Sequence, residues 1–419
     1  MDEYLERQGL GGFISSTHTN TTYLTNFPAR DFLGDRLYNV IPGSGEDLVQ
    51  SYGVYAKGGT RALVLPLSHF LMARFEEGVA SEIYTYGKPP SLRDPHPRFD
   101  TPEELEFEKR LDDPSRNFDS PELALRSAVK DLIVSSAVGV DFAEMSDSSR
   151  KELRRLASSF EFKNGVEFIR MVRMAKSKEE IRRFKKASEI NERAIPKVFD
   201  AMEEGVSEKE LRVVYAREVV SEGALFETGH LMVPTGTKSG ARVVATDSKL
   251  ASGTAGMLDA TCSYMGYYSD VGDSFVLGKP SEKLKKYYDT LERVNETCEE
   301  IIAPFVKPSE LNKEAAKIWE KRNLPVPPTG MGHGLGLEVH EYPRITAAKG
   351  DVLSHDDAVR DDVVKCSVDI PFEEGMILAI EQPCKVWGWG GVHFERNFLV
   401  GKNGCRRLTV QERFLRILG

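Results

Sequence analysis

The stretch LDATCSYMGYYSDV, residues 258–271, places two aspartates in a segment that otherwise has the composition of a β-hairpin. Aspartate is depleted in strands, yet Asp259 and Asp270 both lie inside this strand-like sequence. A turn near residues 264–266 would put the two carboxylates on neighbouring strands, where they would repel each other unless cations neutralise them. The alternative is that one of the aspartates simply caps a turn. The pair by itself therefore leaves a metal site and a turn cap open.

A second segment, TGMGHGLGLEVHEYP at residues 329–343, surrounds a histidine with glycines. Glycines alternate around His333, which indicates that another group approaches the backbone closely there. A single histidine is more often a core residue than a ligand. His333 and His340, however, stand seven positions apart in one glycine-rich segment. This arrangement favours a functional role for the pair.

Two further segments carry glutamates in strand-like sequence. Glu381 ends an apolar run, where an unpaired carboxylate would be costly. His393 and Glu395 fall on one face of the strand expected at residues 391–400, because side chains alternate along a strand. Each of these residues could instead lie in solvent at a strand end. The occurrence of all four elements in one chain favours a shared site.

The length and the pattern of segments indicate two domains. The chain has 419 residues, enough for two or three domains by length alone. Residues 1–165 alternate strand-like and helix-like segments, which predicts an α/β domain. Within it, residues 88–119 carry six prolines and read as a long surface insertion. Residues 166–419 contain capping boxes at 177–180 and 207–210 that begin helices. Long strands of antiparallel type follow, which predicts an α+β domain.

The composition disfavours several classes of protein. The net charge is 56 − 65 = −9, whereas a dedicated nucleic-acid binder shows a basic face. The apolar runs are shorter than the roughly 18 residues of a membrane span, and the first residues are acidic rather than typical of a signal peptide. Five cysteines without CxxC spacing argue against a disulfide framework. We therefore expect a cytoplasmic protein with neither nucleic-acid nor membrane partners.

Taken in order, these motifs resemble the creatinase/prolidase metallopeptidase family, the "pita-bread" fold that includes methionine aminopeptidase, aminopeptidase P and prolidase. The segment NTTYLTNF at residues 20–27 is similar to the family's N-x-x-Y-L-T-G-F motif, and MAKSKEEI at 174–181 to its K-S-x-x-E-I motif. The spacing of the aspartates, 270 − 259 = 11, matches the family's D-x₁₀-D, and GHGLGLEVHE is close to its histidine signature. The resemblance covers nearly the whole chain. It implies a creatinase/prolidase-type N-terminal domain over 1–165 and a pita-bread catalytic domain over 166–419.

The resemblance also implies a dinuclear metal centre with five protein ligands. These are Asp259, Asp270, His333, Glu381 and Glu395. Four carboxylates and one imidazole suit two divalent ions such as Mn²⁺, Co²⁺, Fe²⁺ or Zn²⁺. The implied reaction is cleavage of a peptide or amide bond by a hydroxide that bridges the metals. Glu381 would shuttle protons, and His340 would contact the substrate or the tetrahedral intermediate. The family further implies a homodimer that acts on a small molecule or a short peptide.

Some positions depart from the pattern of Xaa-Pro peptidases and leave the substrate open. Thr329 stands where these peptidases usually carry a histidine, and residues 238–243 lack the usual substrate histidine. Arg242 could instead bind a substrate carboxylate with bidentate geometry, or it could be a solvated arginine at a strand edge. His393 and Tyr264 are further candidate substrate contacts.

Three functions therefore stay open. The first is a dinuclear metallohydrolase of the Xaa-Pro peptidase type. The second is an enzyme of the same fold that hydrolyses a small non-peptide amide or acts as a lyase on a small zwitterion. The lyase branch tends to carry another aspartate where this chain has Thr261. The third is a binding module without catalysis, which the complete ligand set disfavours. An insertion at 344–369 could be a lid, a dimer contact or, more simply, a solvated acidic loop.

Overall fold

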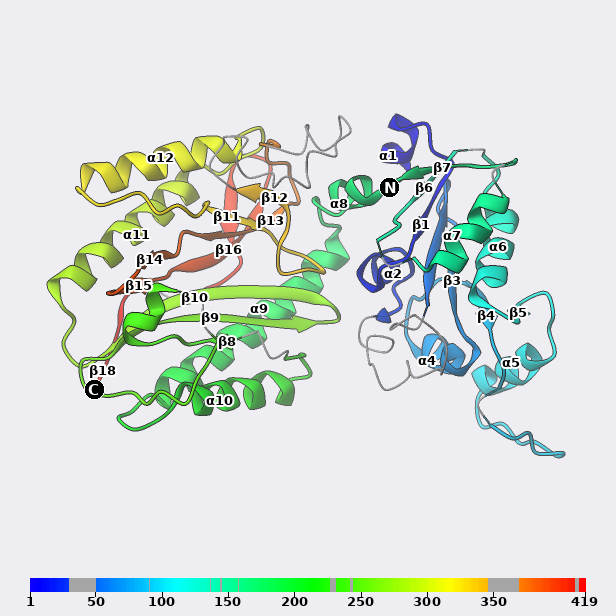
Figure 1. The fold of residues 1–419 in the computed structure, drawn as a ribbon, viewed down its shortest axis with the longest axis horizontal. Coiled ribbons are helices and arrows are strands. Elements are labelled where there is room, and N and C mark those ends of the chain that lie inside the picture. Colours follow the sequence, from blue (N-terminus) through cyan, green and yellow to red (C-terminus); the bar gives the residue numbers. More distant parts are fainter. Residues whose placement is uncertain are drawn as a thin grey trace. The chain divides into compact units, whose positions relative to one another are not determined.

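The chain folds into two compact units, Met1–Val172 and Arg173–Gly419. Each unit has its own sheet and its own hydrophobic core (Figure 1). The computed structural model describes residues 1–29, 50–89, 91–135, 137–143, 145–156, 158–226, 231–241, 244–345, 369–410 and 414–419. Most of the insertion predicted at 344–369, together with Arg242, lies outside these residues.

The described residues of the first unit form a seven-stranded sheet in the order β5-β4-β3-β2-β1-β6-β7. Its strands are β1 (Gly12–Ser15), β2 (Tyr52–Ala56), β3 (Arg61–Pro66), β4 (Glu82–Tyr86), β5 (Asn117–Phe118), β6 (Ala137–Val140) and β7 (Glu161–Asn164). Its helices are α1 (Asp2–Arg7), α2 (His18–Thr25), α4 (Phe70–Phe75), α5 (Pro102–Leu111), α6 (Pro121–Leu132), α7 (Asp147–Arg155) and α8 (Val166–Val172).

Strand β3 shows why this sheet is covered on both faces. Its side chains alternate, so that Ala62 and Val64 pack with α6 and α7, while Leu63 and Leu65 pack with α4. Helices therefore lie on both sides of the sheet, as expected for an α/β domain. The proline-rich stretch 88–119 is not a plain surface insertion, because it contains α5. Thr101 begins this helix with a capping box and a proline at its first turn.

The second unit is built on a larger sheet in the order β12-β11-β13-β16-β10-β9-β8, with β17 beside β16 and β18 beside β10. Its strands are β8 (Leu231–Met232), β9 (Ala255–Tyr264), β10 (Tyr267–Leu277), β11 (Gly332–Gly334), β12 (Glu341–Ile345), β13 (Ile377–Glu381), β16 (Glu395–Val400), β17 (Cys405–Arg407) and β18 (Arg416–Leu418). A separate hairpin is formed by β14 (Cys384–Val386) and β15 (Gly390–Val392). The helices are α9 (Lys178–Asp200), α10 (Glu208–Ser221), α11 (Glu282–Ile301) and α12 (Pro308–Lys321).

The central hairpin β9–β10 turns where the sequence predicted. Met265 and Gly266 connect the strands with φ of +49° and +82°, the conformation that a two-residue hairpin turn with native twist requires. The pleat directs Leu258 and Ala260 into the core formed with α9 and α10. Asp259, which lies between them, therefore faces the opposite side of the sheet.

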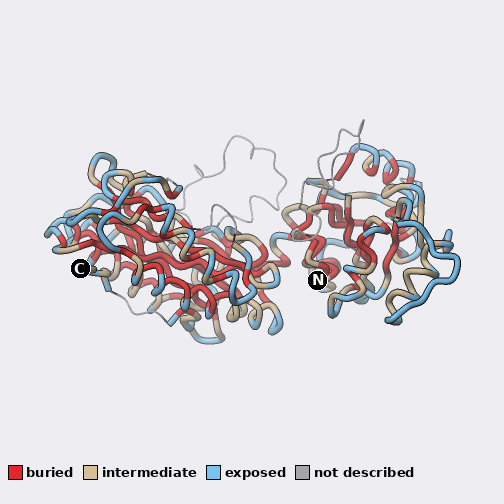
Figure 2. The backbone as a smooth tube through the Cα atoms, turned by 90° about the horizontal axis from the view of Figure 1, so that it is seen from below, coloured by how far each residue is buried: buried red, intermediate tan, exposed pale blue. Residues whose placement is uncertain are grey.

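The two predicted capping boxes begin α9 and α10. Ser177 and Ser207 each accept a hydrogen bond from the backbone three residues later, and the glutamate at that position bonds back. Buried residues concentrate along the strands of both units, and the outer helix faces are exposed (Figure 2). Over the described part of the chain, no helix is long and apolar enough to cross a membrane.

A buried ionic cluster fixes the start of β12. Arg173 donates hydrogen bonds to Glu341 and Glu338, and Lys176 Nζ lies 3.0 Å from Glu341 Oε2. The side chains of Arg173, Lys176 and Glu341 are each less than 5% exposed. Burial alone would raise the pKa of Glu341, but the charges of Arg173 and Lys176 outweigh it and lower that pKa to about 2.

We predict that Glu341→Gln lowers the free energy of unfolding by about 3–5 kcal/mol near neutral pH, because it leaves the buried Lys176 without its anion and Arg173 with only the partly exposed Glu338. Folding lowers the pKa of Glu341 from 4.5 to about 2, so its contribution is present above the unfolded pKa. It is lost as the pH falls through this interval. The difference between variant and wild type should therefore shrink in acid. Urea unfolding followed by circular dichroism at several pH values measures it.

Glu338→Gln is the matched control for this prediction. Glu338 contacts the same arginine, but its side chain is 45% exposed, so its loss should cost about 1 kcal/mol or less. A Glu341→Gln protein as stable as the wild type near neutral pH would contradict the prediction.

Candidate metal centre

Five neighbouring strands of the second unit each contribute one acidic or histidine side chain to a common region. In sheet order these are His333 (β11), Glu381 (β13), Glu395 (β16), Asp270 (β10) and Asp259 (β9). Glu381 is directly opposite Glu395, Glu395 is opposite Gly272, and Gly272 is opposite Asp259. Opposite residues point to the same face of a sheet, and Asp270 is two residues from Gly272. The register thus places the five predicted ligands on one face.

The imidazole of His333 faces three carboxylates. Its Nε2 lies 3.9 Å from Asp270 Oδ2, 3.5 Å from Glu381 Oε1 and 3.9 Å from Glu395 Oε1. Among the described residues, neither this nitrogen nor Glu395 Oε1 has a hydrogen-bond partner, although both are buried. With bonds of about 2.0–2.2 Å, two ligand atoms of one ion lie about 3–4 Å apart. The spacing and the unpartnered atoms fit a cation between these groups.

The backbone of β11 sets the orientation of His333. Its Nδ1 lies 3.0 Å from the carbonyl oxygen of Gly334. A carbonyl only accepts, so Nδ1 carries the hydrogen and Nε2 presents a lone pair to the carboxylates, as in metal-binding histidines. The glycines on either side have no room for a side chain, because a Cβ at Gly332 would lie 1.9 Å from Ala379 O. The predicted close backbone approach around His333 is confirmed.

The carboxylates affect one another's titration. Burial and the neighbouring Asp270 raise the pKa of Glu395 well above its ordinary value. Burial also raises the pKa of Asp259. For Glu381 burial acts in the same direction, but the imidazoles of His333 and His393 outweigh it and lower its pKa well below the ordinary value. The site thus concentrates more negative charge than its imidazoles neutralise, which suits divalent cations.

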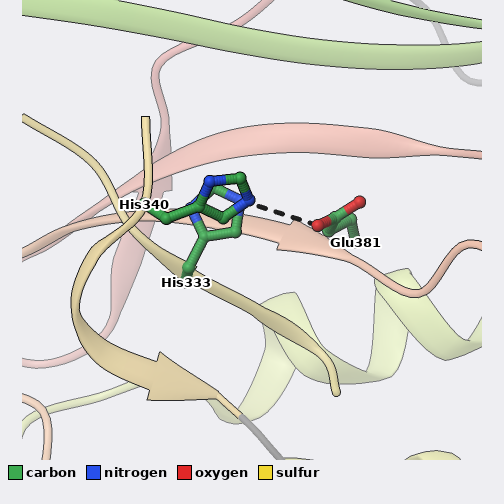
Figure 3. Close-up of side chains that lie close together, drawn as sticks. All are labelled: His333, His340 and Glu381. Carbon is green, nitrogen blue, oxygen red and sulfur yellow. Dashed lines mark ion pairs between the residues drawn. The ribbon is translucent and has the colours of Figure 1, made fainter. Parts of the chain in front are cut away.

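His340 lies beside His333, as Figure 3 shows. The centroids of the two imidazole rings are 4.1 Å apart with an interplanar angle of 50°. His340 is exposed, whereas His333 is only 4% exposed. Both rings lie close to Glu381 in Figure 3. His340 is thus the histidine of this pair that is accessible to an incoming molecule.

A cavity of about 670 Å³ opens onto this face of the sheet. All five predicted ligands line it, as do His340, His393 and Thr329. The volume is in the usual range for small-molecule sites. Tyr264 lies at the turn end of β9, where it packs against the hydrophobic core, and it is not among the residues that line the cavity.

Two cationic residues that the sequence reasoning missed also line the cavity. Arg344 is directly opposite His333 in the β11–β12 ladder, so the two side chains share a face. Lys385 lies on β14, and its charge acts on Asp259 and His393. The signal available in the sequence for Arg344 was the strand-like stretch EYPRI at 341–345, in which every second residue faces the same side. Lys385 lies in none of the motifs.

Two polar side chains hold the backbone of the ligand-bearing strands. Asn397 Oδ1 accepts from Asp270 N at 3.3 Å, and its amide donates back to the carbonyl of Asp270. Arg396 Nη1 donates to the carbonyls of Gly272 and Glu395, each at 2.7 Å. These contacts connect β10 to β16 next to the carboxylates, so they hold the backbone that carries the predicted ligands in place.

Comparisons with known proteins agree with this geometry. The model of "Metallopeptidase family M24" matches residues 182–402, which is 221 of 419 residues. A Xaa-Pro dipeptidase of Pyrococcus horikoshii is 29% identical over 289 residues, 68% of this chain and 75% of the relative. A Xaa-Pro dipeptidase of Pyrococcus furiosus is 29% identical over 257 residues, 61% of this chain and 68% of the relative.

Solved structures show the same fold. The prolidase of Pyrococcus horikoshii superposes with a TM-score of 0.72 at 22% identity, covering 99% of this chain and 98% of the other. The X-Pro aminopeptidase of Thermotoga maritima gives a TM-score of 0.74 at 20% identity, covering 99% of both chains. The predicted pita-bread fold and the predicted hydrolase class are confirmed, and the chain belongs to metallopeptidase family M24.

Proposed function

We propose that this chain is a dinuclear metal-dependent hydrolase of the Xaa-Pro dipeptidase type. The observation that carries the proposal is the placement of four carboxylates and His333 on one face of five adjacent strands, at the edge of a cavity. The names of two relatives, both Xaa-Pro dipeptidases, support the substrate class. On this proposal, the unit Arg173–Gly419 is the catalytic domain.

Two divalent ions would be held by the five ligands predicted from the sequence. Oxygen-rich sites with one or more imidazoles suit Mn²⁺, Co²⁺, Fe²⁺ or Zn²⁺. When bound, such ions polarise a carbonyl and make water a nucleophile near neutral pH. Their charge would also offset the repulsion between Glu381 and Glu395, which are directly opposite each other in the sheet.

The side chains around the ions would position the substrate and move its protons. Glu381 would accept a proton from the attacking water and return it to the nitrogen of the leaving amine. His340 is exposed in the cavity beside His333, so its N–H can donate to the oxyanion of the tetrahedral intermediate.

Arg344 would bind the carboxylate of a dipeptide. It shares a face with His333 and lines the same cavity as Lys385, and a guanidinium binds a carboxylate through two parallel hydrogen bonds. From the sequence alone, Arg242 was the candidate for this role. That assignment also stays a proposal, since Arg242 lies outside the described residues.

A small non-peptide amide or zwitterion is the second candidate substrate. Thr329, where Xaa-Pro peptidases usually carry a histidine, lines the cavity. One polar donor of the peptidase pattern is thus replaced at the site itself. The family resemblance further suggests a cytoplasmic homodimer, and light scattering at micromolar concentration tests the dimer.

The first prediction of this proposal concerns metal content. Protein purified without chelator and loaded with Mn²⁺ or Co²⁺ should bind two ions per chain, and Asp270→Asn should lower that number, because it removes one of the proposed carboxylate ligands. Elemental analysis after gel filtration measures the ratio. Asp200→Asn is the control, since the Asp200 side chain on α9 is 71% exposed. A ratio near zero under all loading conditions would contradict the proposal and favour a binding module.

The second prediction concerns the substrate carboxylate. Arg344→Met should raise KM for Xaa-Pro dipeptides by about 10–100-fold and change kcat less, the loss expected for a hydrogen bond to a charged group. Steady-state kinetics of the metal-loaded protein measures both constants.

A substrate without the carboxylate is the control for this prediction. Wild type and Arg344→Met should cleave the matching Xaa-prolinamide equally well. If KM for dipeptides is unchanged in Arg344→Met but raised in Arg242→Ala, Arg242 rather than Arg344 binds the carboxylate. Cleavage of N-acyl amino acids without cleavage of Xaa-Pro dipeptides would favour the second candidate substrate.

A further inference from the structure

We propose that His393 is a sixth protein ligand of the metal centre and binds an ion together with Glu381 and Glu395. This inference rests on the proposed function, because it concerns the same dinuclear site. It replaces the sequence-based expectation that His393 contacts the substrate.

The two glutamates lie between two imidazoles. Oε1 of Glu381 and Oε1 of Glu395 are their oxygens nearest His333, at 3.5 and 3.9 Å from its Nε2. Oε2 of each is the oxygen nearest His393, at 3.0 and 3.5 Å from its Nε2. Each carboxylate therefore presents one oxygen to each histidine. The geometry provides two groups of ligand atoms, and each group includes one imidazole nitrogen.

The group around His393 can surround an ion. One ligand atom each from Glu381, His393 and Glu395 lie within 4.8 Å of one another. The side chains of His393 and Glu395 are only 3% and 1% exposed. Glu395 keeps its other carboxylate oxygen, Oε1, without a hydrogen-bond partner among the described residues. A buried, incompletely satisfied carboxylate beside a buried imidazole is costly unless a further group completes the arrangement.

Gly272 and Ser274 fix the position of the His393 ring. Gly272 lies directly opposite Glu395 in the sheet. A Cβ built at Gly272 would lie 2.5, 2.6 and 2.8 Å from Cε1, Nδ1 and Nε2 of His393, so the ring occupies the space that any other residue at this position would fill. Ser274 fixes the backbone of His393 from both sides, accepting from its N–H at 2.8 Å and donating to its carbonyl at 2.9 Å.

The direction of the ring distinguishes a ligand from a substrate contact. Nε2 of His393 is within hydrogen-bond distance of a proposed ligand, Glu381, and its position is fixed by Gly272 and Ser274. A second imidazole would also give the centre a preference for ions that accept nitrogen ligands, such as Co²⁺ and Zn²⁺, over Mg²⁺.

The test is calorimetric titration of the metal-free full-length chain with Co²⁺. Wild type should show two binding events. His393→Phe keeps a ring of similar shape against Gly272 and removes the nitrogen. The dissociation constant of one binding event should therefore rise by about 10–100-fold or more, while that of the other stays unchanged. Gly272→Ala should weaken the same event, because it displaces the ring and leaves the histidine in the chain. His96→Arg, at an exposed histidine of the first unit, should leave both events unchanged.

A further variant separates a ligand from a hydrogen-bond donor. His393→Arg retains N–H groups that can reach Glu381, but a guanidinium does not bind metal. If His393 only donates to Glu381, His393→Arg should restore wild-type Co²⁺ binding, and that result would overturn the inference. The inference would also be overturned if both His393→Phe and Gly272→Ala bound two Co²⁺ ions with wild-type affinity. Thermal unfolding of each metal-free variant identifies any that fail to fold, and the inference is then judged on the remaining variant.

The outcomes distinguish this inference from the proposed function. A wild-type chain that binds no Co²⁺ contradicts the dinuclear hydrolase itself, and with it the sixth ligand. A wild-type chain that binds two ions, with variants that also bind two ions at unchanged affinity, contradicts the role of His393 alone.

Discussion

The second unit is organised around carboxylates that share one face of a sheet without enough positive charge to neutralise them. Glu381 and Glu395 are directly opposite each other, and Asp270 and Asp259 follow on the next two strands. Like charges at opposite positions of a sheet destabilise it. A sheet of this composition suits a protein that binds cations, and on the proposed function the imidazoles of His333 and His393 would supply ligand nitrogens.

The rest of the unit holds these side chains in register. Gly332 allows β11 to approach β13, and Gly272 allows His393 to lie against β10. Arg396 and Asn397 donate hydrogen bonds to the backbone of the strands that carry the predicted ligands. Because these contacts involve main-chain atoms and fully buried groups, they are made whether or not a substrate is present. The ligand geometry is thus largely preorganised by the sheet.

The second buried ionic group has a different role. Glu341 is balanced by Arg173 and Lys176, so it needs no external cation. Its lowered pKa and the raised pKa of Glu395 follow from the same burial with different neighbours: cations in one case and other carboxylates in the other. The neighbouring charges thus decide whether a buried acid is held ionised in an ion pair, as Glu341 is, or is a candidate metal ligand, as Glu395 is.

The sequence by itself determined the family, the fold and the five candidate ligands. Hairpin turns, capping boxes and alternating strands depend on residues that are near one another in the chain, so the turn at Met265 and Gly266 and the starts of α9 and α10 could be predicted. The same local signals were overlooked at Thr101, where a capping box begins α5 within a proline-rich stretch.

Only the tertiary structure decided which further residues lie next to the five candidate ligands. The placement of Arg344 beside His333 depends on the pairing of β11 with β12. The role inferred for His393 depends on the absence of a side chain at Gly272, whose place the ring takes, and on which oxygen of each glutamate faces that ring. Both are relations between strands far apart in the sequence, and strand register is fixed by packing and turns along the whole sheet rather than by neighbouring residues.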